Sequence, residues 1–347
     1  MKHRTLPEIL SDAAAFETCT GINALCNSFA LSANDLQLHS LHPRYYQFKV
    51  AKHDGGLREI EAPAFDLKII QQQLNYLLQA VYFKHQTASS YGYIITPAHT
   101  KSKKNILGNA KKHLGHKFML KADFQDFFHQ IKTIDVISIF SGNILHFDER
   151  SSNILARICT YNERLPMGAP TSPVLSNLYT IDADKSLEKW AVQNEVSYTR
   201  FVDDLTFSSV SKSFTQNHLD EISEICRLHN LKLNEAKSKI LGDNDVKEVT
   251  GLVLNQTVDI PLSFYQHLEK DIERLHHIYE ASVLTRQTEN NTVLQKFKQE
   301  VQGQVNFIGM VEGYHSPVFN KYKLMTKEAL EVEEEFLSMR WTNFSYI

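Results

Sequence analysis

One short stretch decides the fold: Tyr198-Thr199-Arg200-Phe201-Val202-Asp203-Asp204-Leu205-Thr206-Phe207-Ser208-Ser209. Alternating apolar, β-branched and aromatic residues on both sides of the Asp pair predict two strands, so the pair falls at the tip of a tight hairpin. Asp favours turns because its side chain bonds the local backbone, and a plain acidic turn is one interpretation. A metal site is the other, because a site that keeps two adjacent carboxylates ionised usually supplies a cation.

Length and composition indicate a folded protein with two or three subdivisions, since 347 residues with 42% hydrophobic content can bury a substantial core. The four cysteines (Cys19, Cys26, Cys159 and Cys226) form no C-x-x-C pair, which predicts free thiols in a reducing cytoplasm. We see no signal peptide and no run of about 18 apolar residues. The sequence therefore predicts a cytoplasmic protein with no membrane partner.

Charge is distributed unevenly along the chain. The net charge of -3 excludes a uniformly basic nucleic-acid binder. Residues 101–121, however, carry seven Lys, two His and no acid, whereas residues 328–335 carry five Glu. Because salt screens charges beyond about 8–10 Å, a bound polyanion responds to the local patch. The Lys-rich stretch is interpreted either as such a patch or as an ordinary solvated surface.

The first 43 residues predict short helices without a chemical motif. A strand over 44–52, a turn at 53–56 and a second strand over 57–63 then predict a hairpin. The hairpin would bring Lys49, Lys52 and Arg58 to an exposed tip. Cations there suit a triphosphate or a phosphate backbone, and a merely solvated hairpin is equally consistent with the pattern.

A second carboxylate follows an apolar run. Helices are predicted over 66–83 and 105–116, and the strand beginning at Phe118 ends in Asp123, with Asp126 and two Phe close behind. A lone Asp at a strand end is usually a turn former. Asp123, like Asp203, follows a strand that is predicted to be buried.

Residues 165–173 contain three Pro and one Gly, which exclude a helix or a central strand. Ser172 as N-cap and Pro173 at the first helical position predict a helix that runs to about Gln193. A loop at a helix N-terminus presents N–H groups to a nucleotide or a template backbone. Further along, we predict a helix over 217–229, a hairpin over 248–261 with its turn at 255–256, and long C-terminal helices from 263.

In this order the elements resemble reverse transcriptases, and more narrowly the retron reverse transcriptases of bacteria. The resemblance covers roughly residues 44–261. The matched elements are the basic hairpin with Lys52 and Arg58, Asn109-Ala110-x-x-His113, Asp123 with Phe127-Phe128, residues 165–173, Phe201-Val202-Asp203-Asp204, Asn234-x-x-Lys237, and Val249-Thr250-Gly251.

The resemblance implies an α+β right-hand polymerase fold with fingers, an antiparallel palm sheet with helices, and a helical thumb. The expected divisions are an N-terminal helical extension (1–43), fingers and palm (44–122 and 132–175), the catalytic palm (123–131 and 176–261) and an RNA-binding thumb (262–347).

Attack of a 3′-hydroxyl on a nucleoside triphosphate uses two divalent ions about 3.5–4 Å apart, and Mg²⁺ prefers oxygen ligands. The resemblance therefore implies two Mg²⁺ ions with metal ligands Asp123, Asp203 and Asp204. It also implies that Lys237 assists the departing pyrophosphate and that Phe128 excludes a ribose 2′-hydroxyl. The remaining expected contacts are Lys52, Arg58, Met167 and Gly168 with the incoming dNTP, and Asn109, His113, Thr250, Gly251, Lys270 and Arg274 with nucleic acid.

Two positions depart from the family pattern. Phe201 and Val202 replace the commoner Tyr/Phe-Ala, which keeps apolar packing ahead of the Asp pair. Met167 stands where Gln is usual, so fidelity or nucleotide affinity could change.

Three functions remain open at this point. The first is a retron enzyme that copies part of a cognate structured noncoding RNA into multicopy single-stranded DNA (msDNA) from an internal 2′-hydroxyl. Such an enzyme acts in anti-phage defence with a separate effector protein. The second is another reverse transcriptase, of the group II intron or abortive-infection type. The third is a structural scaffold for an RNA–DNA hybrid.

Overall fold

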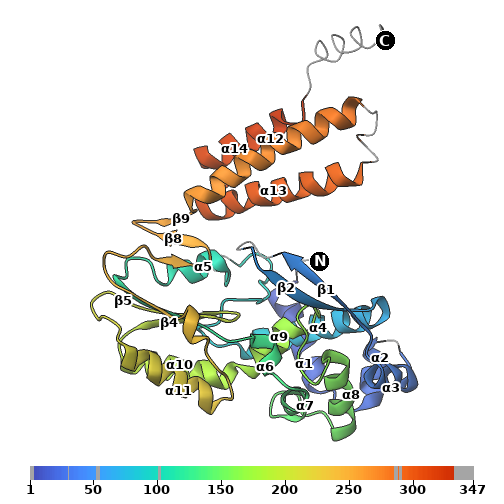
Figure 1. Cartoon of the computed structure of the whole chain (residues 1–347). Coiled ribbons are helices and arrows are strands. Elements are labelled where there is room, and N and C mark those ends of the chain that lie inside the picture. Colours follow the sequence, from blue (N-terminus) through green and yellow to red (C-terminus); the bar gives the residue numbers. More distant parts are fainter. Residues whose placement is uncertain are drawn as a thin grey trace. The chain divides into compact units, whose positions relative to one another are not determined.

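A computed structural model describes residues 4–29, 31–51, 55–100, 103–284, 288 and 291–331. The chain divides into two compact units, Met1–Lys247 and Glu248–Ile347. Both contain helices and antiparallel strands, and the second is mainly helical (Figure 1). The predicted α+β class is confirmed. No helix among the described residues is both long and apolar enough to cross a membrane.

The first unit begins with three helices, α1 (Leu6–Glu17), α2 (Ile22–Phe29) and α3 (Ala33–Leu41). Helix α1 buries Ile9, Ala13 and Phe16 and packs against the long helix α4 (Phe65–His85). The N-terminal helices therefore share the core of the first unit.

A two-stranded antiparallel sheet lies between α3 and α4 in sequence. Strands β1 (Tyr45–Ala51) and β2 (Leu57–Pro63) pair from Tyr45 opposite Pro63 to Ala51 opposite Leu57, as the predicted hairpin requires. Lys52, predicted to contact the triphosphate, lies outside the described residues.

The central sheet of the first unit has four antiparallel strands in the order β4-β5-β3-β6. The strands are β3 (Phe118–Asp123), β4 (Ser197–Phe201), β5 (Asp204–Ser209) and β6 (Lys239–Leu241). Helices α10 (Ile181–Gln193) and α11 (Gln216–Leu228) lie along one face of this sheet (Figure 1). Trp190 of α10 meets the Phe207 ring edge-on at 5.5 Å, so aromatic packing fastens that helix to β5.

Five shorter helices complete the first unit: α5 (Ile106–Lys111), α6 (Phe127–Gln130), α7 (Thr133–Ser141), α8 (Glu149–Cys159) and α9 (Ser172–Tyr179). A short 3₁₀ turn, η1 (Glu235–Lys237), precedes β6.

The single helix predicted from Ser172 to Gln193 is wrong, because α9 and α10 are separated at Thr180. The Thr180 hydroxyl donates to the carbonyls of Ser176 (3.0 Å) and Asn177 (3.1 Å), a side-chain bond that competes with the helical ladder. The N-cap of α9 is Thr171 rather than Ser172. Ser172 instead donates to the Pro166 carbonyl at 2.7 Å and ties the loop to the helix start.

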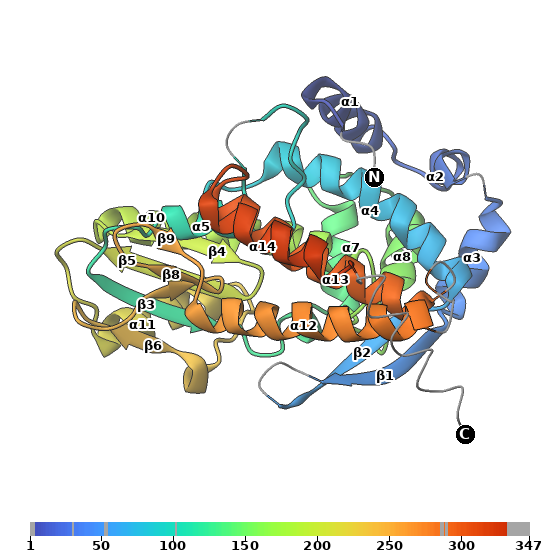
Figure 2. The same cartoon turned by 90° about the horizontal axis from the view of Figure 1, so that it is seen from above.

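The second unit contains a small antiparallel sheet and three helices. Strands β7 (Glu248–Val249), β8 (Leu252–Leu254) and β9 (Val258–Asp259) pair in that order, so a third strand joins the predicted hairpin. Helix α13 (Thr292–Glu312) packs against both α12 (Leu262–Leu284) and α14 (Pro317–Glu328), as Figure 2 shows from above.

Candidate active site

The Asp pair lies at a two-residue turn between β4 and β5. Phe201 and Asp204 form the last register pair, which leaves Val202 and Asp203 as the turn itself. Val202 has a φ of +61°, a conformation that is costly for a β-branched residue. The Arg200 guanidinium donates to the Val202 carbonyl at 2.9 Å and helps to hold this strained turn.

Strand β3 delivers the third carboxylate to the same place. Asp123 stands directly opposite Asp204 in the β3–β5 register, and the Phe124 N–H donates to the Asp203 carbonyl at 3.0 Å. Backbone pairing thus brings Asp123 to the adjacent pair Asp203-Asp204, from which it is far apart in sequence.

Burial and mutual repulsion disfavour the ionised form of the Asp203 and Asp204 carboxylates. Burial raises the pKa of Asp204 to about 6, with further contributions from the charges of Asp203 and Asp123. Burial also raises the pKa of Asp203, followed by repulsion from Asp123. The Lys237 Nζ donates to Asp123 Oδ1 at 2.9 Å, and this hydrogen bond raises the pKa of Lys237. Lys237 and Arg58 partly counteract the rise in the pKa of Asp203.

The donor chemistry fits a divalent ion. Across the described parts of the chain, no group of three or more His, Cys, Asp or Glu side chains is arranged to hold a metal. Asp123 instead points one oxygen at Lys237. The set nevertheless offers only hard oxygen donors, and its raised pKa values mark negative charge that a cation would neutralise. Members of the polymerase family implied by the motifs use such ions.

Behind the turn lies a buried ion pair that sequence reasoning missed. Arg200 is fully buried and makes two bonds to Asp184 of α10, Nε to Oδ1 at 2.8 Å and Nη2 to Oδ2 at 2.7 Å. Its Nη1 also donates to Asn177 Oδ1 at 3.0 Å. Although burial acts in the opposite direction, the Asp184 charge raises the pKa of Arg200, so the guanidinium stays charged. A charged residue inside a strand predicted to be buried is the signal that could have revealed the pair.

Residues 89–92 support the turn from the other side of β4. The Arg200 N–H donates to the Ser89 carbonyl and the Tyr91 N–H to the Arg200 carbonyl, both at 2.9 Å. A Cβ atom on Gly92 would lie 2.8 Å from the Val202 nitrogen. Only glycine therefore lets this segment approach the strained turn.

Asn109 and His113, both predicted to contact nucleic acid, are buried in this structure. The His113 ring bonds Ser208 Oγ and Thr199 Oγ1, both at 2.6 Å, and so links the turn that follows α5 to strands β5 and β4. Burial, followed by nearby cationic groups, lowers the pKa of His113 to about 3 and keeps the ring neutral.

The loop that carries Met167 and Gly168 is fastened to strand β2. The Glu61 N–H donates to the Met167 carbonyl at 2.8 Å. Gly168 has a φ of +134°, and a Cβ atom there would lie 2.9 Å from the Ile60 side chain. This glycine is thus required by both backbone conformation and close packing.

Glu61 ties three elements together. Its side chain is only 2% exposed, and Oε1 accepts a hydrogen bond from Arg164 Nη2 at 3.1 Å. His129 of α6 lies 3.5 Å from the other oxygen. The neighbouring Phe128 is partly buried against the core, with its ring centroid 5.6 Å from that of Phe127. Glu61 thus bonds Arg164 and lies beside the helix that carries Phe128.

The other predicted contacts lie in the second unit. Thr250 and Gly251 form the β7–β8 turn with φ values of +51° and +78°. Lys270 and Arg274 are exposed on α12, and the Arg274 guanidinium lies 5.0 Å from the Phe297 ring centroid.

Comparison with known proteins identifies relatives over most of the chain. Residues 50–310 match the family "Reverse transcriptase (RNA-dependent DNA polymerase)". The retron Ec86 reverse transcriptase of Escherichia coli is 30% identical over 248 residues, covering 70% of this chain and 73% of that protein. The retron Ec83 reverse transcriptase of the same organism is 29% identical, covering 50% of this chain and 56% of that protein. The retron Mx65 reverse transcriptase of Myxococcus xanthus is 26% identical, covering 67% and 58%.

Among solved structures the likeness is distant: apo telomerase from Candida tropicalis gives a TM-score of 0.46 at 12% identity, covering 82% of this chain and 61% of that one. The family match spans well over half of the sequence and includes the strand-end carboxylates. An RNA template and deoxynucleoside triphosphates follow as substrates. The chain belongs to the reverse transcriptase family, among its retron members, and is an RNA-directed DNA polymerase.

Proposed function

We propose that this polymerase copies part of a cognate structured noncoding RNA into msDNA, starting from a 2′-hydroxyl of that RNA, so that the product is an RNA–DNA hybrid. The observation that carries the proposal is the placement of Asp123 opposite the Asp203-Asp204 turn in a chain similar to retron enzymes. This arrangement supplies the carboxylates that nucleotidyl transfer needs.

Asp123, Asp203 and Asp204 would hold two Mg²⁺ ions, which when bound stabilise the attacking and leaving oxygens. Lys237, bonded to Asp123, would offset charge on the departing pyrophosphate. Arg58, whose charge reaches Asp203, would hold the triphosphate together with Lys52. Phe128 would exclude a ribose 2′-hydroxyl, and Met167 and Gly168 would border the incoming nucleotide.

In this proposal residues 44–122 and 132–175 form fingers and palm, and residues 123–131 and 176–261 form the catalytic palm. Residues 1–43 form an N-terminal helical extension. The helices of 262–347 act as a thumb, with Lys270, Arg274 and the Thr250-Gly251 turn contacting nucleic acid through phosphates and shape. The enzyme would work in the cytoplasm with a separate effector protein in anti-phage defence.

The test is to express the full chain with its neighbouring noncoding RNA and to sequence the nucleic acid that co-purifies. The wild type should yield a branched RNA–DNA hybrid, and an Asp203→Asn/Asp204→Asn variant should yield RNA alone. Asp182→Asn provides a matched control, because it makes the same change at an exposed position of α10.

DNA synthesis that survives the double substitution would refute the catalytic assignment. Linear DNA without a branch would instead identify a reverse transcriptase of another type.

A further inference from the structure

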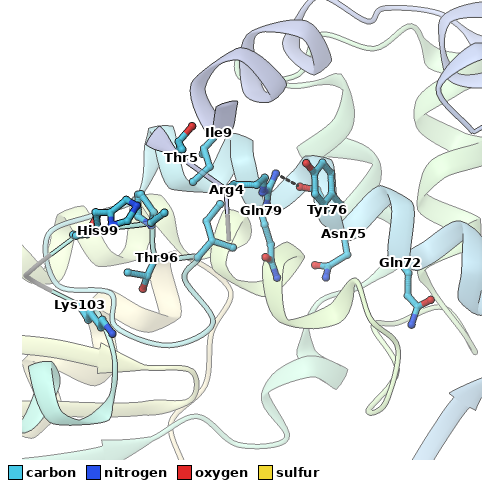
Figure 3. Close-up of a pocket in the computed structure, with 14 residues that line it drawn as sticks. Arg4, Thr5, Ile9, Gln72, Asn75, Tyr76, Gln79, Thr96, His99 and Lys103 are labelled. Atoms are coloured by element: carbon cyan, nitrogen blue, oxygen red, sulfur yellow. Dashed lines mark hydrogen bonds between the residues drawn. The ribbon is translucent and has the colours of Figure 1, made fainter. Parts of the chain in front are cut away.

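A cavity of about 1090 Å³ opens in the first unit between α1, α4, residues 95–100 and Lys103 (Figure 3). It shares none of its described lining residues with the carboxylate site. Its size exceeds that of most small-molecule sites, which span about 300–1,000 Å³. The cavity is therefore large enough for more than one nucleotide or for a short polymer segment.

One side of the cavity is a stripe along α4 formed by Gln72, Asn75, Tyr76 and Gln79. The spacing of three, four and seven residues puts these side chains within one broad face of the helix. In Figure 3 the Tyr76 ring lies beside Arg4, and the amides of the other three residues point away from it. Amide groups donate and accept hydrogen bonds in the patterns that nucleobase edges require, and unpaired bases expose those edges. The stripe therefore offers both base-edge partners and an aromatic ring.

Tyr76 is 45% exposed and is held in place from behind. The Arg4 guanidinium lies 3.8 Å from its ring centroid and donates to the Tyr76 carbonyl at 3.2 Å. Arg4 is itself fixed by an ion pair with Asp12 at 3.2 Å. A ring fixed in this way can stack on a base without first losing side-chain entropy.

The rim of the cavity favours an anion. None of the described residues that line it is acidic, whereas Lys103 and His99 are exposed there. Lys103 begins the described part of the Lys-rich stretch. Its carbonyl lies against Gly108 of α5. Lys111 at the end of that helix and Lys112 directly after it are exposed. The phosphates of a bound nucleic-acid strand would contact these cations where the strand leaves the cavity.

We propose that this cavity binds unpaired nucleotides, with bases against the α4 stripe and phosphates at Lys103. The RNA template and the DNA product share that chemistry. A duplex does not fit the proposal, because pairing hides the Watson–Crick edges and stacking covers the faces of the bases. The inference rests on the proposed function only in naming the RNA template and the DNA product as the sources of the bound strand.

The experiment uses the full chain without nucleotides and a 15-nucleotide single-stranded RNA of mixed sequence that contains 4-thiouridine, alongside a DNA of the same sequence with 4-thiothymidine. Crosslinked peptides are mapped by mass spectrometry, and affinity is measured by fluorescence anisotropy at several salt concentrations. The variants are Tyr76→Ala, Gln72→Ala/Gln79→Ala and Lys103→Ala. Lys185→Ala, exposed on α10, is the control.

We expect crosslinks within 72–79, within 95–100 or at Lys103. Tyr76→Ala and the double Gln variant should each weaken binding about tenfold, because stacking and base-edge contacts contribute that much per base. Lys103→Ala should lower the slope of log K against log salt by about 0.7, the value for one lost contact with a single-strand phosphate. Lys185→Ala should change neither quantity. The arm with the larger loss, RNA or DNA, identifies the source of the strand.

Unchanged affinity in all three variants, or crosslinks confined to other segments, would overturn the inference. Extension of a DNA primer on an RNA template by the wild type separates this failure from failure of the proposed function. If the wild type extends the primer and the cavity variants bind as tightly as the wild type, the proposed function holds and the cavity proposal is refuted. Loss of binding in a chain that never extends a primer supports the cavity and refutes the proposed function.

Discussion

Asp184→Asn should destabilise the first unit by about 3–5 kcal/mol, which is the usual cost of removing one partner from a buried ion pair. Asp184 accepts four hydrogen bonds, two from Arg200 (2.8 and 2.7 Å), one from Tyr198 (2.9 Å) and one from Thr87 (3.1 Å). Asparagine keeps the shape but turns an N–H₂ group toward these donors and leaves the Arg200 charge without a counter-ion.

The assay is urea unfolding followed by far-UV circular dichroism and by tryptophan fluorescence, to which Trp190 on the same helix as Asp184 contributes. Asp182→Asn is the matched control, because Asp182 is 77% exposed in its pair with Lys185 and should change the free energy of unfolding by less than about 1 kcal/mol. A double-mutant cycle with Arg200→Met should show coupling of about 1–3 kcal/mol, since the two residues share one network.

The same substitution should lower DNA synthesis even where the protein is folded, because Arg200 also holds the Val202 carbonyl of the Asp turn. A loss of less than 1 kcal/mol in Asp184→Asn, equal to that of the control, would refute the argument that this pair stabilises the unit. Full activity in a variant with the expected destabilisation would refute its link to the turn.

Three other changes test separate parts of the site. Because burial lowers the pKa of His113 to about 3, the unfolded chain takes up a proton near pH 6.5 that the folded chain does not. The wild type should therefore lose up to roughly 1.4 kcal/mol of stability per pH unit below 6.5 from this group. Urea unfolding at pH 5 and 6.5 should show that the free energy of unfolding of His113→Gln lacks this loss. An equal change with pH in the two proteins would contradict the prediction. Gly92→Ala places a Cβ atom 2.8 Å from the Val202 nitrogen and should cost about 1–3 kcal/mol while reducing primer extension at least tenfold, so wild-type extension would show that the turn tolerates the shift. Glu61→Gln removes the charge that pairs with Arg164 and should raise the KM for deoxynucleotides about three- to tenfold with a smaller effect on kcat; an unchanged KM would mean that this contact does not position the nucleotide site.

Several elements were predictable because their signals are local. Alternation of apolar residues placed strands on both sides of the Asp pair, and the turn between them needs only two residues. The basic hairpin before α4 followed from the same kind of pattern. The order of the motifs was sufficient to indicate the family.

Other features depended on contacts that no local pattern contains. Asn109 and His113 look like polar helix residues, yet both are buried once α5 packs against strands β4 and β5. The break at Thr180 reflects side-chain bonding to the preceding turn, which competes with a strong helical pattern. The surroundings of Glu61 depend on Arg164 and His129, which only the fold brings beside it.

The sequence by itself determined the Asp-tipped hairpin, the class of the fold and the family, because these depend on periodicity and on motif order. Only the tertiary structure decided that Asp123 stands opposite Asp204 and that Arg200 closes on Asp184 behind the turn. Strand register and helix packing join residues that are distant in the chain, and the free energy that selects those pairings comes from burial and hydrogen bonding across the whole unit rather than from any short segment.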